Sequence, residues 1–161
     1  MIDNNINELE NFALKCREDI IKMSARGGCF IGASLSCVDL IVYLYKKLFI
    51  LKDIKLKSNN RDYFILSKGH GCLALYAILA DKGFFERSEL SRFCQPESIL
   101  GGHPERGKIP GVEASTGALG HGLPIGVGVA LAAKIRKQSH RVVVVTGDGE
   151  INEGSIWESA M

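Results

Sequence analysis

The sequence predicts an α/β layered fold built around a parallel sheet. Two short apolar runs, 63–66 and 142–145, have the composition of buried strands, and the second consists of four consecutive valines. Strands that are apolar on both faces are typical of a parallel sheet covered by helices. The segments around these runs repeat their apolar residues at helical spacing. The order helix, strand, helix, helix, strand, helix therefore favours an α/β architecture.

The composition places the chain among soluble globular domains. It has 161 residues, of which 46% are hydrophobic and 24% charged, so we expect a single domain over residues 1–161 with a real core. The formal charge is only +2 and the basic residues are scattered, which disfavours nucleic acid as a partner. The sequence shows neither a basic leader nor an apolar run of bilayer length. We therefore expect a soluble, cytoplasmic protein that binds neither nucleic acid nor membrane.

The cysteines indicate a reducing compartment. Their number is odd and none forms a Cys-x-x-Cys pair, so neither a disulfide framework nor a zinc site is predicted. Buried free thiols explain them most simply. They are Cys16, Cys29, Cys37, Cys72 and Cys94.

The first half of the chain predicts three helices and one strand. The first helix is amphipathic, and Gly27 and Gly28 end it. Ser36, with Asp39 three positions later, predicts the start of the second helix. The expected elements are helix 6–23, helix 36–48, a lysine-rich connection 50–61, strand 63–66 and helix 73–82.

The second half predicts a long irregular segment between helices. Residues 94–120 are rich in Gly, Pro, Ser and Thr and lack periodicity, which is typical of a functional loop. The helix that follows carries small residues, Gly126 and Ala130 among them, along one face, so it can lie close against a sheet. The expected elements are a short helix 88–93, the loop, a helix ending near Lys137, strand 142–145 and a helix from Ser155.

The turn after the second strand predicts a site for a metal-bound phosphate. The strand ends in Gly147-Asp148-Gly149, just before the last helix. Glycines allow the backbone to approach a ligand, and free N–H groups at a helix start favour an anion. The Asp148 carboxylate is a hard oxygen donor for Mg²⁺ or Ca²⁺. Because Gly-Asp-Gly also occurs in plain turns, that alternative stays open from these residues alone.

Two histidines in loops are candidates for acid–base or anion-binding roles. His70 follows the first strand in a Gly-flanked turn, where a side chain can project from the carboxyl edge of a sheet. His103 lies in the Gly- and Pro-rich loop and titrates near neutrality. A structural histidine and a polar surface loop are the alternatives. We expect His121 to be a neutral hydrogen-bonding group and His140 to be solvent-exposed.

Other active-site motifs are missing from the sequence. It contains no Gly-x-Ser-x-Gly elbow of a hydrolase and no P-loop of a nucleotidase. The Gly120-x-Gly122 spacing, with no strand before it, is a weak match to a dinucleotide-binding loop.

Four motifs, taken in order, resemble the amino-terminal thiamine-diphosphate-binding part of transketolases. The resemblance covers nearly the whole chain and is closest to transketolases made of two subunits. It implies a three-layer α/β fold with a mostly parallel sheet flanked by helices. The motifs are Ser67-Lys68-Gly69-His70-Gly71, Gly102-His103-Pro104-Glu105, the segment 111–122 and Gly147-Asp148-Gly149-Glu150-x-x-Glu153-Gly154.

The resemblance also implies roles for these residues. Asp148 would ligate the Mg²⁺ that holds the diphosphate of thiamine diphosphate, and Gly149, beside Gly147, would offer its N–H to the diphosphate. His70 would hydrogen-bond near the diphosphate and the reacting centre, and His103 would contact the donor fragment. The aminopyrimidine ring would lie against Gly117, Ala118 and Leu119, and Glu153 would sit at an interface between subunits.

The sequence departs from the family pattern at Phe30. The family has a histidine there, in Gly-His-Ile-Gly-Gly-Ser-Leu-Ser, whereas this chain reads Cys29-Phe30-Ile31-Gly32-Ala33-Ser34-Leu35-Ser36. A phenyl ring cannot hydrogen-bond a sugar hydroxyl or shuttle a proton. The substitution therefore indicates a less hydroxylated substrate, such as a two-carbon unit from pyruvate; simple packing of the ring is the alternative.

A second departure is that the sequence stops at Met161, before the Asn that completes the family's metal site. We therefore expect a truncated chain with an incomplete sheet and negligible activity by itself.

The resemblance implies transfer of a two-carbon ketol or acyl unit from a ketose-like or 2-keto-acid donor to an aldehyde-like acceptor. A partner subunit would supply the glutamate that activates the pyrimidine, in a homo- or hetero-oligomer, and the substrate would be a sugar phosphate or a keto acid. The alternatives are a deoxyxylulose-phosphate synthase, the α-subunit of a 2-oxo-acid dehydrogenase, and a non-catalytic remnant that binds a full-length homologue.

Overall fold

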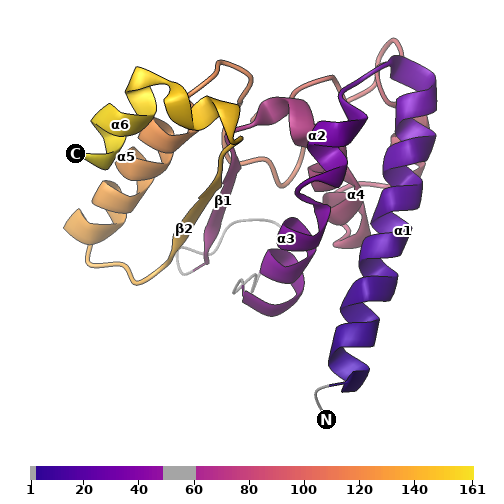
Figure 1. Cartoon of the computed structure of the whole chain (residues 1–161), viewed down its shortest axis with the longest axis horizontal. Helices are drawn as coiled ribbons and strands as arrows, with labels where there is room; N and C mark the ends of the chain where they lie inside the picture. Colours follow the sequence, from indigo (N-terminus) through magenta and orange to yellow (C-terminus); the bar gives the residue numbers. More distant parts are fainter. Residues whose placement is uncertain (1–2, 49–60) are drawn as a thin grey trace. The chain divides into compact units, whose positions relative to one another are not determined.

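The computed structural model describes residues 3–48 and 61–161, and in this part of the chain the residues form two compact units. The first unit is drawn from residues 1–49 and 70–102, and the second from residues 50–69 and 103–161. Each unit is described by itself below, with its elements labelled as in Figure 1. Most of the predicted lysine-rich connection 50–61 lies outside the described residues. The expectation of one domain over 1–161 stays a prediction.

The first unit is helical and packs around helix α4. Its elements are α1 (Asp3–Gly27), α2 (Ile31–Leu35), α3 (Val38–Tyr43), the π-helical turn η1 (Leu44–Leu48), α4 (Cys72–Asp81) and the 3-10 helix η3 (Arg87–Arg92). Every residue of α4 from Cys72 to Ala80 is buried, because the segment carries no charge before Asp81 and can pack on all sides. Helices α1, α2 and α3 all contact α4, so α4 forms the centre of this core.

The sequence predictions for this unit are confirmed except near residues 31–48. Helix α2 was not predicted, and the next helix begins at Val38 rather than at Ser36. The Ser36 hydroxyl donates to the Ala33 carbonyl at 3.0 Å, so it closes the turn behind it instead of capping the helix ahead. The predicted helix 36–48 is therefore α3 followed by one π-helical turn. The predicted short helix 88–93 is the 3-10 helix η3.

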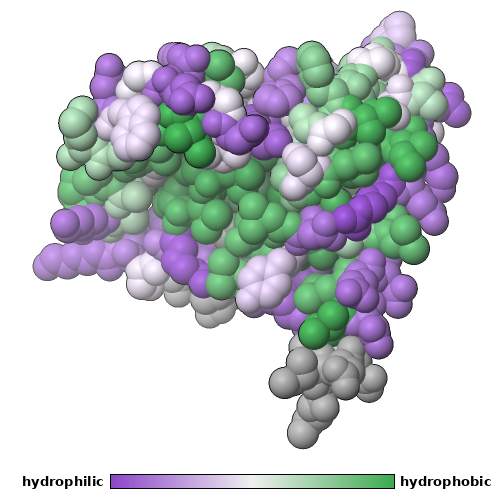
Figure 2. All heavy atoms as spheres, viewed as in Figure 1, coloured by the Kyte–Doolittle hydropathy of each residue, from purple (hydrophilic) through white to green (hydrophobic). Residues whose placement is uncertain are grey.

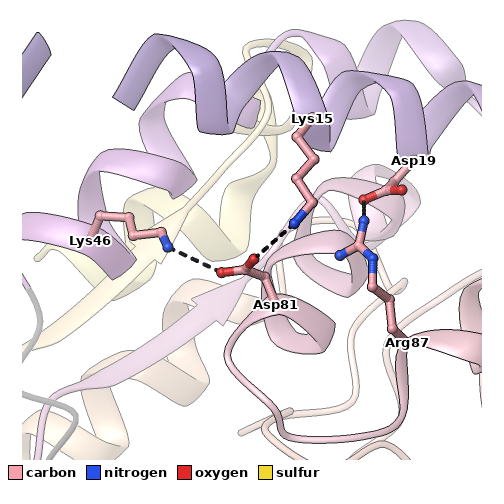
Figure 3. Close-up of polar contacts among 5 residues, drawn as sticks. All are labelled: Lys15, Asp19, Lys46, Asp81 and Arg87. Carbon is pink, nitrogen blue, oxygen red and sulfur yellow. Dashed lines mark hydrogen bonds and ion pairs between the residues drawn. The ribbon is translucent and has the colours of Figure 1, made fainter. Parts of the chain in front are cut away.

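Ion pairs tie three elements of the first unit to one another (Figure 3). Asp81, at the end of α4, accepts from Lys15 of α1 at 3.5 Å and from Lys46 of η1 at 3.1 Å. Asp19 of α1 pairs with Arg87 of η3. Lys46 also lies 3.8 Å from the centre of the Phe12 ring, which adds a cation–π contact.

The second unit contains a two-stranded parallel sheet in the described part of the chain. Strand β1 (Tyr63–Leu66) pairs with β2 (Val142–Val145) in the register Tyr63↔Val142 to Leu66↔Val145. Helix α5 (Gly122–Ile135) packs on both strands and on α6 (Gly154–Ala160), and the 3-10 turn η4 (Gly149–Asn152) connects β2 to α6. The predicted bounds of both strands and the parallel α/β arrangement are confirmed.

Arginine–carboxylate pairs hold the beginnings of these strands. Arg141 donates to Asp62 through its backbone N–H at 2.8 Å and its guanidinium at 2.6 Å. Arg61 pairs with Glu113, one contact being 3.0 Å, so the strand is tied to the loop before α5. His140 is not solvent-exposed as predicted. Its ring tilts against Tyr63 with centroids 4.8 Å apart, and both ring nitrogens are buried without a hydrogen-bond partner among the described residues.

The end of α5 differs slightly from the prediction. The helix ends at Ile135 rather than near Lys137, because Lys137 adopts a left-handed conformation with φ of 53°. Its N–H donates to the Lys134 carbonyl at 3.2 Å, and the Gln138 N–H donates to Ala133 at 2.9 Å. This is a Schellman ending built on lysine, whereas glycine is the usual residue there.

The surface of the second unit is strongly apolar. Residues Val142–Val144 of β2 are only partly buried, so the predicted covering of both faces of this strand is not found among the described residues. Apolar side chains gather over α5 and β2 in the left half of Figure 2. The exposed ones in this unit include Ile125, Leu131, Ile135 and Trp157. Exposed apolar area of this kind is typical of a contact surface.

Within residues 3–48 and 61–161, no helix combines the length and the apolar character that a bilayer crossing requires.

A glycine in α5 tests the close packing of this helix on the sheet. A Cβ at Gly126 would lie 2.4 Å from Cγ2 of Val144, whereas a Cβ at Gly128 would meet nothing within 4 Å. We expect Gly126→Ala to lower the free energy of unfolding by about 1–2 kcal/mol, because overpacking outweighs the helix propensity gained. The matched control Gly128→Ala should raise it by up to about 1 kcal/mol. Urea unfolding measures both, and equal effects would contradict the packing.

A buried thiol in the first unit predicts a dependence of stability on pH. Burial, followed by the charges of Asp19 and Asp81, raises the pKa of Cys16 from 9.0 to about 12. Because the folded state holds the proton that the unfolded state loses, this stabilisation is complete below pH 9 and is lost as the pH rises toward 12. We expect the unfolding free energy to fall by up to about 1.4 kcal/mol per pH unit more in the wild type than in Cys16→Ala over this window. Parallel pH curves in urea unfolding would exclude this role of Cys16.

Candidate functional site

The turn after β2 presents one exposed carboxylate. Gly147 is buried, whereas Asp148 and Gly149 are exposed. Asp148 has φ of −61° and ψ of −46° and precedes the 3-10 turn η4. In the part of the chain that the structure describes, the Asp148 carboxylate has no hydrogen bond or ion pair. Its oxygens are therefore open to a cation.

A second carboxylate in this turn, that of Glu150, is 2% exposed and binds three donors. Its Oε2 accepts from the Gly147 N–H at 2.9 Å. Its Oε1 accepts from the Gly120 N–H at 2.9 Å and from the Ser67 hydroxyl at 2.5 Å. The turns after β1, before α5 and after β2 therefore meet at one side chain.

Ser67 extends this cluster to the first turn of α5. Its hydroxyl oxygen accepts from the Gly122 N–H at 3.1 Å. A Cβ at Gly122 would lie 2.4 Å from this oxygen, so only glycine allows the helix to begin so close to β1. The sequence reasoning missed the roles of Ser67 and Glu150. The signal that could have found Glu150 was its position three residues after Gly147, which lets a carboxylate fold back on its own turn.

The loop before α5 brings His103 against Gly117. Gly117 has φ of 142°, and a Cβ there would lie 2.9 Å from Cδ2 of the His103 ring. Gly117, Ala118 and Leu119 are exposed, as is His103. The structure thus places these four predicted site residues on one exposed stretch of the second unit. The ring nitrogen Nδ1 of His121 lies 2.7 Å from the Leu119 carbonyl oxygen, in line with the predicted hydrogen-bonding role of His121.

Glu153 lies close to the same loop. A Cβ at Gly120 would be 2.8 Å from Cβ of Glu153, and the Ser155 hydroxyl donates to the Gly120 carbonyl at 2.8 Å. The start of α6 is therefore fixed against the loop before α5. Glu153 is partly buried, and its predicted place between subunits stays a prediction.

His70 belongs to the first unit, where Phe30 contacts it. His70 lies in the 3-10 turn Gly69–Gly71, and the Phe30 ring meets it edge to face with centroids 5.7 Å apart. Phe30 is 65% exposed, so core packing does not explain the phenyl ring. In the same unit the Tyr76 hydroxyl donates to the Gly101 carbonyl at 2.9 Å, and the Cys72 thiol donates to Gly102 at 3.2 Å. These bonds anchor the chain just before His103.

The residues of the second unit fit part of a thiamine diphosphate and metal site. The Asp148 carboxylate is open, and a Cβ at Gly149 would meet nothing within 4 Å, so a ligand can approach this backbone. The Thr116 hydroxyl is buried without a hydrogen-bond partner among the described residues, beside Gly117. No group of three or more His, Cys, Asp or Glu side chains that could hold a metal is found within residues 3–48 and 61–161. Asp148 would therefore share a metal with ligands from elsewhere.

Comparison with known proteins identifies relatives over most of the chain. A family model described as "Transketolase, thiamine diphosphate binding domain" matches residues 16–161. One of the two subunits of the apulose-4-phosphate transketolase of Actinobacillus succinogenes is 42% identical over 157 residues, which cover 96% of this chain and 57% of the relative. The 6-deoxy-6-sulfo-D-fructose transketolase subunit SqwG of a Clostridium species is 38% identical over 131 residues, covering 81% of this chain and 48% of that protein. The chain therefore spans about half the length of these relatives.

Solved structures agree with this relationship. Transketolase from Campylobacter jejuni matches with a TM-score of 0.84 and 31% identity, covering 94% of this chain and 25% of that one. Transketolase from Leishmania mexicana matches with a TM-score of 0.83 and 31% identity, covering 94% and 24%. The predicted fold class and the predicted resemblance are both confirmed. The chain belongs to the transketolase family and carries its thiamine-diphosphate-binding domain.

Proposed function

We propose that the chain is the diphosphate-binding part of a two-subunit, transketolase-type enzyme. Such an enzyme transfers a two-carbon ketol or acyl unit from a ketose-like or 2-keto-acid donor to an aldehyde-like acceptor. The observation that carries the proposal is the open Asp148 carboxylate in a turn whose backbone Glu150 holds. The names of the relatives, which describe them as subunits, support a protein that works with a second chain.

Asp148 would ligate Mg²⁺, or Ca²⁺ in its place, and Gly147 and Gly149 would line the diphosphate. A carboxylate oxygen suits either hard cation, and the exposed backbone at Gly149 suits an anionic ligand. Gly117, Ala118 and Leu119 would contact the aminopyrimidine ring. When bound, thiamine diphosphate supplies the carbanion stabilisation that carbon–carbon bond cleavage requires.

His70 and His103 would handle protons and hydrogen bonds at the substrate. Histidine is suited to this because its ordinary pKa lies near neutral pH. The close approach of His103 to Gly117 orients its ring, so that an exposed ring edge can donate to or accept from a substrate oxygen. His70 would hold its proton near the diphosphate and the reacting centre.

A partner subunit would complete the active site in a homo- or hetero-oligomer. It would supply the glutamate that activates the pyrimidine, and Glu153 would lie at the interface between subunits. The exposed Ile135 and Trp157 of the second unit support the proposal, because they offer apolar area to a second chain.

Replacing the open carboxylate tests the proposed site. In a complex of this chain with its partner subunit, we expect Asp148→Ala to weaken Mg²⁺-dependent binding of thiamine diphosphate at least about 100-fold, because the metal loses a ligand. Isothermal titration calorimetry measures the affinity, and ketol transfer should fall in parallel. The control Glu158→Gln, on the exposed side chain of α6, should leave both unchanged. Wild-type affinity in Asp148→Ala would refute the assignment.

Replacing the phenyl ring beside His70 tests the substrate preference. We expect Phe30→His to raise kcat/KM for a ketose phosphate donor about tenfold, because an imidazole can hydrogen-bond a hydroxyl that a phenyl ring cannot. The control Phe30→Leu removes the ring but adds no polar group, so it should not raise this value. Steady-state kinetics with ketose and pyruvate donors distinguish the cases. An unchanged donor preference in Phe30→His would show that Phe30 only packs.

A further inference from the structure

We propose that Glu150 is a positioning residue that fixes the two backbone segments lining the thiamine diphosphate site. The inference rests on the proposed function for its cofactor but not for its geometry. All contacts that carry it lie within the second unit.

The two oxygens of Glu150 serve different segments. Oε2 holds the N–H of Gly147, the residue directly before Asp148. Oε1 holds the N–H of Gly120, the residue directly after Leu119, together with the Ser67 hydroxyl. One side chain therefore sets the distance between the metal-ligand turn and the loop proposed for the pyrimidine.

Because a peptide group is planar, fixing an N–H also fixes the carbonyl bonded to it. The Gly120 N–H and the Leu119 carbonyl belong to one peptide group. Glu150 holds its N–H end, while Nδ1 of His121 lies 2.7 Å from its oxygen. The orientation of the backbone at Leu119 is therefore set from both ends. At the other segment, the peptide group that leads into Asp148 is held at Gly147.

A neutral side chain of the same shape cannot replace this carboxylate. A glutamine offers one acceptor oxygen, so it can serve Gly147 or the pair Gly120 and Ser67, but not both. Its amide N–H groups would face the remaining donor. An unpaired buried donor is costly, so one of the two segments would move. Glutamate is therefore required at this position by the number of donors it must satisfy.

The test follows Glu150→Gln in the complex of this chain with its partner subunit. We expect the affinity for thiamine diphosphate in the presence of Mg²⁺ to fall about tenfold to 100-fold, as for other residues that orient ligands indirectly. Hydrogen exchange at Gly120 or Gly147 should accelerate about tenfold in the chain without cofactor, because one hydrogen bond is lost. Exchange at Ser67, whose N–H donates to the Val145 carbonyl at 2.9 Å in the strand ladder, should not change.

Matched variants separate positioning from stability. Glu158→Gln makes the same chemical change on an exposed residue and should alter neither readout. Ser67→Ala removes one donor but keeps the carboxylate, so it should retain most of the affinity. If Glu150→Gln does not fold, Glu150→Asp, whose shorter side chain cannot reach both segments, takes its place with the same expected losses.

Three outcomes decide the matter. Loss of cofactor affinity in a folded variant together with local exchange at Gly120 or Gly147 supports the inference. Unchanged affinity, whether stability falls or not, overturns it and shows a structural role alone. If the wild-type complex binds no thiamine diphosphate, the proposed function fails and the positioning role fails with it, while the exchange data still report whether Glu150 joins the two segments.

Discussion

The parallel pairing of β1 with β2 is the constraint on which the candidate site depends. Parallel strands end at the same edge of a sheet, so the turns that follow Leu66 and Val145 meet there. Helix α5 packs across both strands, and its approach is close because Gly126 places no side chain against Val144. The first turn of α5 is thereby brought to Ser67. Three segments far apart in sequence share one edge, and Glu150 joins them.

Local patterns in the sequence were sufficient for the elements and for the residues of the motifs. The four valines of β2 and the uncharged run of α4 identify a strand and a buried helix directly, because composition reports burial on all sides. The turn at Asp148 was recognisable for a similar reason, since strand, glycines and carboxylate are consecutive in the chain. Lys137 misled the prediction at the end of α5, because its left-handed conformation depends on hydrogen bonds rather than on residue type.

Contacts between distant segments could not be predicted in the same way. The bond from Ser67 to Glu150 spans 83 positions, and no local pattern marks either partner. His140 was misjudged because its polar neighbours in sequence suggested exposure, whereas Tyr63 from the adjacent strand covers its ring. The contact between Phe30 and His70 likewise depends on tertiary structure. The sequence indicated that Phe30 was unusual but not which group the ring meets.

Two carboxylates separated by one residue have opposite environments, and this division explains how a short turn can be both rigid and reactive. Asp148 and Glu150 flank Gly149 at the start of the 3-10 turn, where successive side chains point in different directions. Glu150 turns inward and its oxygens satisfy three donors, so little acceptor capacity remains for a ligand. Asp148 turns outward and is not needed by the fold. A single carboxylate could not do both, because each lone pair spent on backbone N–H groups is unavailable to a cation. The glycine between them lets the chain make the turn and leaves its backbone open at the surface.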